Sequence, residues 1–395
     1  NEYREFFNFN LVHVVSNESG ADHPSQGIDV DTALEAQYDY AGLDRLLVVN
    51  DAIVKQIVRS AFPELLETLT YIFVLVNDET YGGSGGEVAV TSVNEYAPEI
   101  LLHEAGHMIG DLADEYDDPW PGYVPVGEEA NVTEEDDPAK IKWRVWIENG
   151  TPLPTPEEDI YADVVGLFEG ARYQASGIYR PRLDCRMRAL GVDFCEVCTE
   201  ALLESMYVVL QPSDASGGEV YVYEGESVVI DAEPLHTTSN FIKVTWSLDD
   251  VPMENVNSSE YEVNADEMRE GVHSLKALIF DDGGYIRRAD ALELARSTVE
   301  WTLIVEGGAN PDGDQDNVTD GDSEIAVDGD DAFEDGDQSD SDANLQVDGD
   351  ESPDGGDYEP HGSASDSGCS ESEVPSGLFI VMCALLLLRR KTVQH

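Results

Sequence analysis

The sequence predicts a mixed α/β domain, an all-β domain with an immunoglobulin-like sandwich architecture, and a disordered acidic tail. Three observations support this division. Residues 1–211 mix strand-like alternation with helix-like spacing of apolar residues. Residues 212–306 contain short strand patterns separated by turns. Residues 307–373 are rich in Asp, Gly and Ser and bury too little apolar surface to fold, and an apolar segment, 374–395, ends the chain.

The mixed domain contains candidates for both kinds of element. Residues 9–15 alternate as a strand, residues 44–60 have helical spacing, and residues 71–76 form an apolar run typical of a buried strand. A glycine-rich segment, Tyr81–Gly86, comes next. A phosphate-binding loop would need a helix directly after the glycines and usually a lysine. Neither is present, so we expect a tight turn or a flexible rim that leads into another strand at Val88–Val90.

The most specific motif is His103-Glu104-Ala105-Gly106-His107. Two histidines four residues apart project from one face of a helix, so both imidazoles can reach one Zn²⁺. Glu104 is not needed as a ligand and is placed to take a proton from a metal-bound water. Gly110 suits the end of the helix, because glycine adopts the left-handed conformation without strain. The chain can then turn back and present a carboxylate to the same metal.

An exposed polar stripe is the alternative interpretation of the two histidines. Pro98 suits the first turn of a helix, and Glu99 favours its positive end. The same segment carries an apolar stripe formed by Ile100, Leu101, Ala105 and Met108. We therefore expect a packed helix whose histidines border a core, which is where a cleft site belongs.

The charge of the chain excludes some classes of partner. The formal net charge is −62, and no Lys or Arg occurs between Arg296 and Arg389. Such a surface repels nucleic acid and anionic lipid, so neither is expected as a direct partner.

The all-β segment shows no catalytic pattern. Its regular strand spacing and a buried tryptophan candidate, Trp246, favour a β-sandwich. Trp246 lacks flanking cysteines, so the likeness to immunoglobulin domains concerns architecture only.

Three of the five cysteines, Cys185, Cys195 and Cys198, lie close together in the sequence. The spacing of Cys195 and Cys198 is that of a zinc or redox pair, but a second such pair is missing. In an exported protein, a disulfide within the trio is the better interpretation.

The acidic tail has two interpretations. Its repeated Asp-Gly-Asp words do not fit the full spacing of a calcium loop, so we favour a disordered stalk over weak Ca²⁺ association. The apolar run Leu378–Leu388 is short for a bilayer-spanning helix and is followed by Arg389-Arg390-Lys391. With Cys369 upstream, it resembles the C-terminal sorting tails of myxobacterial-type surface proteins, which implies a short hydrophobic helix and attachment to the outer surface of a bacterial cell.

Residues from about Phe9 to Met206 resemble the IgA-peptidase family of zinc metallopeptidases, in the metzincin-like group. Beyond the histidine motif, the resemblance rests on several unusual short sequence motifs in the same order. These are residues 15–22, 31–34, 44–47, Asn77 with 81–86, 112–116, 179–181, 185–188 and 194–198. It implies a secreted or cell-surface endopeptidase of metzincin-like fold. Immunoglobulin cleavage is known only for some members and is not carried over.

The resemblance also implies roles for individual residues. Met187 would lie beneath the zinc site as a packing support, and Tyr179 would stabilise the oxyanion through its hydroxyl. The Tyr81–Gly86 loop would lead into an edge strand that holds substrate by β-augmentation. A disulfide from Cys185 to Cys195 or Cys198 would brace the Met187 loop.

The third zinc ligand has to come from the acidic residues after the helix. Metzincins usually place this ligand ten residues after the first histidine, where this chain has Ala113. Asp111 follows Gly110 too closely for the chain to have turned back. Asp114 needs only a slightly wider turn and is the favoured ligand, with Glu115 as the alternative. If Asp114 binds, Glu115 would orient the ligands by hydrogen bonding.

These observations together predict a monomeric, zinc-dependent endopeptidase that acts on protein or peptide substrates. A non-catalytic surface adhesin that keeps the fold is the main alternative, and a calcium-dependent structural protein is another. Glu104 argues against the adhesin, because only catalysis needs it.

Overall fold

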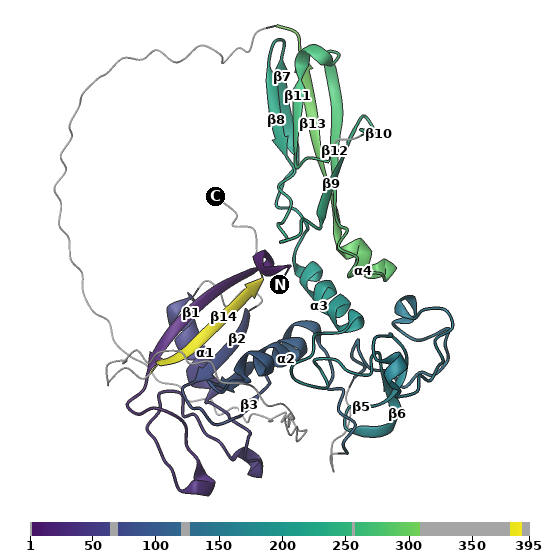
Figure 1. Ribbon diagram of the computed structural model, residues 1–395. Coiled ribbons are helices and arrows are strands. Elements are labelled where there is room, and N and C mark those ends of the chain that lie inside the picture. The colour runs from purple at the N-terminus through teal and green to yellow at the C-terminus, as the bar shows by residue number, and fades with distance from the viewer. Residues whose placement is uncertain (1, 64–69, 120–126, 255–256, 309–379, 389–395) are drawn as a thin grey trace, which may run out of the picture.

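The computed structural model describes residues 2–63, 70–119, 127–254, 257–308 and 380–388 (Figure 1). Its α-helices are α1 (Asp51–Ala61), α2 (Ala97–Gly110), α3 (Glu196–Val209) and α4 (Ala289–Leu294). Its 3₁₀ helices are η1 (Arg4–Phe6), η2 (Pro24–Gln26), η3 (Tyr40–Gly42), η5 (Arg144–Trp146), η6 (Asp159–Tyr161) and η7 (Ala265–Glu267). The chain is thus a mixed helix and sheet protein with several sheets, as the sequence predicts. The predicted acidic linker and most of the terminal segment lie outside the described residues.

The first sheet supports the histidine helix. In spatial order it consists of β1 (Phe7–Val15), β14 (Ile380–Leu388), β2 (Thr70–Val76), β4 (Val88–Ser92) and β3 (Gly83–Ser84). Strands β2 and β4 pair in parallel, and the other pairs are antiparallel. Helix α1 packs on one face with Val74 and Val90, and α2 packs on the other with Phe73 and Ala89. Burial on both faces explains the continuous apolar run at 71–76.

The terminal apolar segment has a backbone that differs from the expected short helix. Residues Ile380–Leu388 form β14, which pairs antiparallel with both β1 and β2. A short apolar run without polar alternation fits a buried strand as well as a helix, so its pattern alone does not decide between them. Among the described residues, no helix is both long and apolar enough to cross a membrane.

The second large unit is a two-sheet arrangement. One sheet has the order β10 (Val251–Pro252), β9 (Ile242–Leu248), β12 (Gly271–Asp281), β13 (Arg296–Glu306) and β7 (Gly218–Tyr223). The other pairs β11 (Glu260–Asn264) with β8 (Ser227–Asp231). Trp246 is buried between them, 5.7 Å from Trp301 and 5.6 Å from Tyr261 between ring centroids. The buried tryptophan and the all-β architecture agree with the sequence prediction.

Helix α3 joins this unit to the histidine half (Figure 1). Tyr207 on α3 and Tyr3 near the N-terminus both donate hydrogen bonds of 2.8 Å to Asp281 of β12. Phe6 packs edge-on against Tyr207. This contact has no signature in the sequence, because its members are far apart along the chain.

A small hairpin completes the histidine half. It consists of β5 (Phe168–Ala171) and β6 (Gln174–Arg180), joined by a two-residue turn at Arg172 and Tyr173. Both turn residues have positive φ, 51° and 56°. Non-glycine residues adopt this conformation only where the surroundings enforce it.

Candidate metal centre and active site

Helix α2 presents the two histidines. It begins after Tyr96 with Pro98 in its first turn, and it ends at Gly110. The left-handed residue is Asp111, with φ 47°, and not Gly110 as the sequence suggested. Gly110 instead allows close packing, since a Cβ there would lie 3.1 Å from Leu202 of α3. The helix therefore stops one residue later than predicted, and the chain still turns back toward the histidines.

Backbone carbonyls fix the orientation of both imidazoles. The Nδ1 of His103 donates to the carbonyl oxygen of Arg186 at 2.9 Å, and the Nδ1 of His107 donates to that of Leu112 at 2.6 Å. Both Nε2 atoms then face Oδ1 of Asp114, at 3.1 Å and 3.4 Å, and lie 3.2 Å from each other. Donation from the distal nitrogen to a carbonyl is the usual way in which a metal-binding histidine is held.

The β5–β6 turn holds Asp114. The hydroxyl of Tyr173 donates to Oδ2 of Asp114 at 2.7 Å, which leaves Oδ1 directed at the histidines. The backbone nitrogens of Arg172 and Tyr173 donate to the carbonyls of Asp114 and Tyr116 at 3.0 Å and 2.8 Å. The unfavourable backbone of the turn thus positions the segment that carries the carboxylate. Sequence reasoning missed Tyr173, because nothing in the sequence links it to a residue 59 positions earlier.

The geometry of these three residues fits a zinc ion. Their ligand atoms all lie within 4.8 Å of one another. Two nitrogens about 2.05 Å from a tetrahedral zinc would be ~3.3 Å apart, close to the observed 3.2 Å. Burial of His107 alone would lower its pKa, but the Asp114 carboxylate outweighs that effect and raises the pKa of His107 to about 9. A proton and a metal cation thus compete for this site.

Glu104 lies beside the histidines but is not part of the ligand set. It is buried, and its carboxylate packs against the glycine-rich loop. A Cβ added at Gly85 would be 2.3 Å from Oε2 of Glu104. The loop therefore approaches the carboxylate so closely that only glycine leaves it in place.

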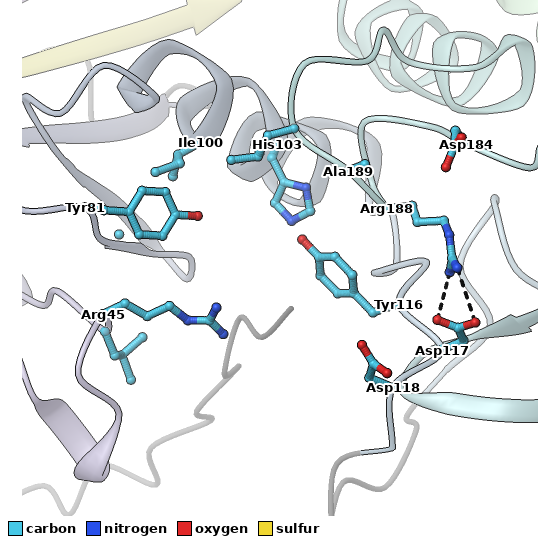
Figure 2. A pocket seen from close by; sticks show the side chains of 13 residues that line it. Arg45, Tyr81, Ile100, His103, Tyr116, Asp117, Asp118, Asp184, Arg188 and Ala189 are labelled. Carbon is cyan, nitrogen blue, oxygen red and sulfur yellow. Dashed lines mark hydrogen bonds and ion pairs between the residues drawn. The ribbon is translucent and has the colours of Figure 1, made fainter. Parts of the chain in front are cut away.

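An open pocket of about 290 Å³ borders His103 (Figure 2). Its lining residues come from α2 and from segments before and after it in the chain. They include Arg45, Tyr81, Ile100, Tyr116, Asp117, Asp118, Asp184 and Arg188. In Figure 2 the hydroxyl of Tyr116 points toward the His103 imidazole, and Arg188 forms an ion pair with Asp117 at 3.1 Å. The pocket thus reaches one side of the histidine cluster.

Tyr179 is the residue that the sequence predicted for the oxyanion. Its backbone nitrogen and oxygen are hydrogen-bonded to Thr133 at 2.8 Å and 3.0 Å, and its ring packs on the cluster that contains Leu112. It does not line the pocket beside His103. Tyr116 does, and its position directly after Asp114 and Glu115 is the signal that could have identified it.

The strand that follows the glycine-rich segment, β4, is not an edge strand as predicted, because it pairs with β2 on one side and with β3 on the other. The edge strand is β3, within the glycine-rich segment, and its outer side is not open at Gly83. There the backbone nitrogen bonds to the carbonyl of Arg45 at 3.3 Å, and the carbonyl accepts from Leu47 at 3.4 Å. The other side of Gly83 pairs with Thr91 of β4. The predicted addition of a substrate strand would have to displace the Arg45–Leu47 segment at this point.

Met187 lies under α2. It is fully buried, and a Cβ at Gly106 would be 2.6 Å from its sulfur. Its carbonyl accepts from the backbone nitrogen of Glu115 at 2.8 Å. The Met187 turn therefore contacts both the helix and the ligand segment.

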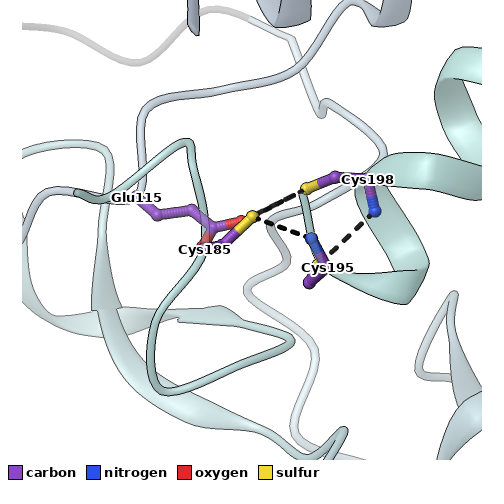
Figure 3. A group of neighbouring side chains, drawn as sticks. All are labelled: Glu115, Cys185, Cys195 and Cys198. Atoms are coloured by element: carbon purple, nitrogen blue, oxygen red, sulfur yellow. Dashed lines mark hydrogen bonds between the residues drawn. The ribbon is translucent and has the colours of Figure 1, made fainter. Parts of the chain in front are cut away.

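Glu115 points away from the histidines, toward Cys185, Cys195 and Cys198 (Figure 3). It is fully buried, and Asn131 donates to its Oε1 at 2.8 Å. The three cysteines are free, with Cys185 and Cys198 sulfurs 3.5 Å apart, compared with about 2.05 Å in a disulfide. The predicted disulfide is thus not formed in this structure.

Comparisons with known proteins identify the catalytic half. The family model described as IgA Peptidase M64 matches residues 1–163 and 157–206. No curated protein matches the chain significantly. Among solved structures, one match is to the fibronectin(III)-like modules of Clostridium thermocellum CbhA, with 20% identity over 24% of this chain and 94% of that chain and a TM-score of 0.17. Since the family model covers more than half of the sequence, the chain belongs to the IgA peptidase M64 family of metal-dependent peptidases, whose substrates are proteins.

Proposed function

We propose that this peptidase is a zinc endopeptidase whose active site consists of His103, His107, Asp114 and Glu104. The observation that carries the proposal is the convergence of both Nε2 atoms on Oδ1 of Asp114, beside a buried glutamate that is not one of the ligands. Two histidines and one carboxylate leave a fourth position on zinc open for chemistry.

The metal and the protein have separate tasks in this mechanism. Zn²⁺ held by the three ligands would supply the Lewis acidity that polarises a scissile carbonyl and acidifies a water molecule. Glu104 accepts the proton of the attacking water and passes it to the leaving amine. The Tyr116 hydroxyl, directed at the same place, donates a hydrogen bond to the developing oxyanion. Tyr173 keeps Asp114 oriented.

Glu104→Gln tests this function. The amide keeps the shape of the side chain but cannot take the proton, so peptide hydrolysis should fall between roughly a hundredfold and ten-thousandfold. Zinc content should stay at the wild-type value, because Glu104 is not a ligand. Glu95→Gln, the same change on an exposed residue just before α2, is the matched control and should keep full activity.

Two outcomes would contradict the proposal. Hydrolysis above a tenth of the wild-type rate in Glu104→Gln would remove Glu104 from the mechanism. Wild-type protein loaded with zinc that cleaves no peptide in a proteome-derived peptide library would favour the alternative, a non-catalytic surface adhesin.

We also propose that the protein acts outside the cell, attached to the envelope of a bacterium by its C-terminal tail, with segment 374–395 as a sorting signal that is removed so that the mature chain ends near Cys369. The support is the acidic charge together with the apolar run and its basic flank. The pairing of Ile380–Leu388 in the first sheet is a competing use of the same residues. Mass spectrometry of surface protein decides between them: peptides spanning Leu378–His395 should be missing if the tail is processed, and their recovery would support β14.

A further inference from the structure

The second cluster has the composition and shape of a closed metal site. One ligand atom each from Glu115, Cys185, Cys195 and Cys198 lies within 4.8 Å of the other three (Figure 3). All four residues are buried, with exposed fractions between 0% and 6%. Structural zinc sites have this character: four protein ligands, mostly thiolates, and no path for solvent.

The sulfur separation favours a metal over a disulfide. In a tetrahedral zinc site with bonds of about 2.3 Å, two sulfurs are ~3.8 Å apart. The Cys185 and Cys198 sulfurs are 3.5 Å apart, much closer to this value than to the length of a disulfide bond. A single disulfide would also leave the third cysteine and Glu115 without a function in the cluster.

One polar atom of the cluster has no hydrogen-bond partner among the described residues. Oε2 of Glu115 is buried and, within the described part of the chain, has no hydrogen-bond partner. Such an orphaned carboxylate oxygen costs free energy unless a cation or a proton is added. Burial also raises the pKa of Glu115 well above its ordinary value.

Two backbone N–H groups donate to sulfurs of the cluster. The nitrogen of Cys195 donates to the Cys185 sulfur at 3.3 Å, and the nitrogen of Cys198 donates to the Cys195 sulfur at 3.5 Å. Cys195 is the N-cap of α3, and Cys198 lies in its first turn, where the helix dipole favours negative charge. Thiolates are the form that binds zinc.

We propose that Glu115, Cys185, Cys195 and Cys198 bind a second, structural zinc ion. This site does not depend on the proposed peptidase mechanism. Its ligands come from three segments that meet at the active site: Glu115 directly follows Asp114, Cys185 precedes the Met187 turn by two residues, and the other two begin α3. The ion fixes these segments relative to one another and so holds the Asp114 carboxylate in place.

Metal content of the purified full-length protein is the first measurement. Wild-type protein, prepared without added reductant and dialysed against zinc, should contain two zinc ions per chain. The double variant His103→Ala/His107→Ala lacks the open site and should retain one. Replacement of zinc by Co²⁺ in this double variant should give thiolate-to-cobalt charge-transfer absorption in the near ultraviolet.

Substitutions in the cysteine cluster should remove the other zinc ion. Cys185→Ser/Cys198→Ser should lose one zinc and the charge-transfer absorption, with a lower Tm. Cys369→Ser, the same change outside the cluster, should keep two zinc ions. Cys198→His replaces one zinc ligand by another and should retain the metal, which keeps the test informative if the serine variant does not fold.

Three results would overturn the second site. These are no zinc in the histidine double variant, a disulfide-linked peptide joining Cys185 to Cys195 or Cys198, or three freely titrating thiols in metal-loaded protein. A cobalt-thiolate spectrum in a protein without peptidase activity would leave the second site intact and count only against the proposed function.

Discussion

Asp114 and Glu115 are neighbours in the sequence, yet they belong to two different clusters. Adjacent residues of one loop thus supply a carboxylate to the histidines and another to the cysteines. The histidine cluster borders a pocket of about 290 Å³, whereas the cysteine cluster is buried on every side. A catalytic metal site needs a position that is open to solvent, whereas a structural metal site is closed. The exposure of a cluster therefore distinguishes a catalytic from a structural site better than the identity of its ligands does.

The largest expected effect comes from Asp114→Ala. Loss of the third ligand should strip metal from the histidines and reduce hydrolysis roughly a thousandfold or more, while metal at the cysteines stays bound. Metal content and the cobalt spectrum measure the two clusters separately. Asp111→Asn, which removes a nearby charge at a left-handed position that Asn tolerates, is the control and should keep both metals.

The corresponding change at the neighbouring carboxylate, Glu115→Ala, should affect the cysteine cluster more than the histidine cluster. The cysteine metal should be weakened first, and hydrolysis should fall less than in Asp114→Ala. If Glu115→Ala strips the histidine site and Asp114→Ala does not, the assignment of the two carboxylates is reversed.

A smaller loss is expected from Gly85→Ala. The new Cβ would lie 2.3 Å from Oε2 of Glu104 and must push the carboxylate aside. We expect kcat to fall about a hundredfold, since a displacement of the order of 1 Å has that effect on a catalytic group, with the metal content of both clusters unchanged. Gly218→Ala, where a Cβ meets no atom within 4 Å, is the control. Unchanged kcat in Gly85→Ala would place the working position of Glu104 elsewhere.

Tyr173→Phe should affect the histidine cluster alone. The change removes the hydrogen bond to Oδ2 of Asp114, so zinc affinity at the histidines should fall about tenfold, as for other groups that orient a ligand. Tyr179→Phe is the matched control and should change neither affinity nor kcat. A kcat reduced more than tenfold in Tyr179→Phe would restore the oxyanion role that the sequence suggested for it.

The pH dependence of metal binding tests the histidine cluster without a mutation. In metal-free protein the Asp114 carboxylate raises the pKa of His107 to about 9, so below that pH zinc must displace a proton. Affinity should therefore rise with pH, by up to about tenfold per unit, and level off near pH 9. The zinc concentration that restores half of the hydrolysis, measured from pH 6 to pH 9, reports on the histidine cluster. A flat profile would mean that His107 carries no proton in the metal-free protein.

Local patterns in the sequence determined much of this protein. The spacing of His103 and His107 on a helix, the buried run at 71–76 and the strand spacing of 212–306 are all set by residues close together in the chain. These patterns express helix and strand geometry, which acts over a few residues, and so they can be recognised without the fold. The family membership also follows from short sequence motifs, each formed by residues close together in the chain.

Only the tertiary structure decided how distant residues meet. Glu115 and Cys198 are 83 positions apart, and Tyr173 reaches Asp114 across 59, so no periodicity relates them. Cys195 and Cys198, which have no second cysteine pair in the sequence, are joined in the fold by Cys185 and Glu115. The apolar segment Ile380–Leu388 forms a strand, because β1 and β2 both pair with it. Long-range packing fixes such contacts: the Met187 turn packs against α2 and α3, and its carbonyl accepts a hydrogen bond from the backbone nitrogen of Glu115.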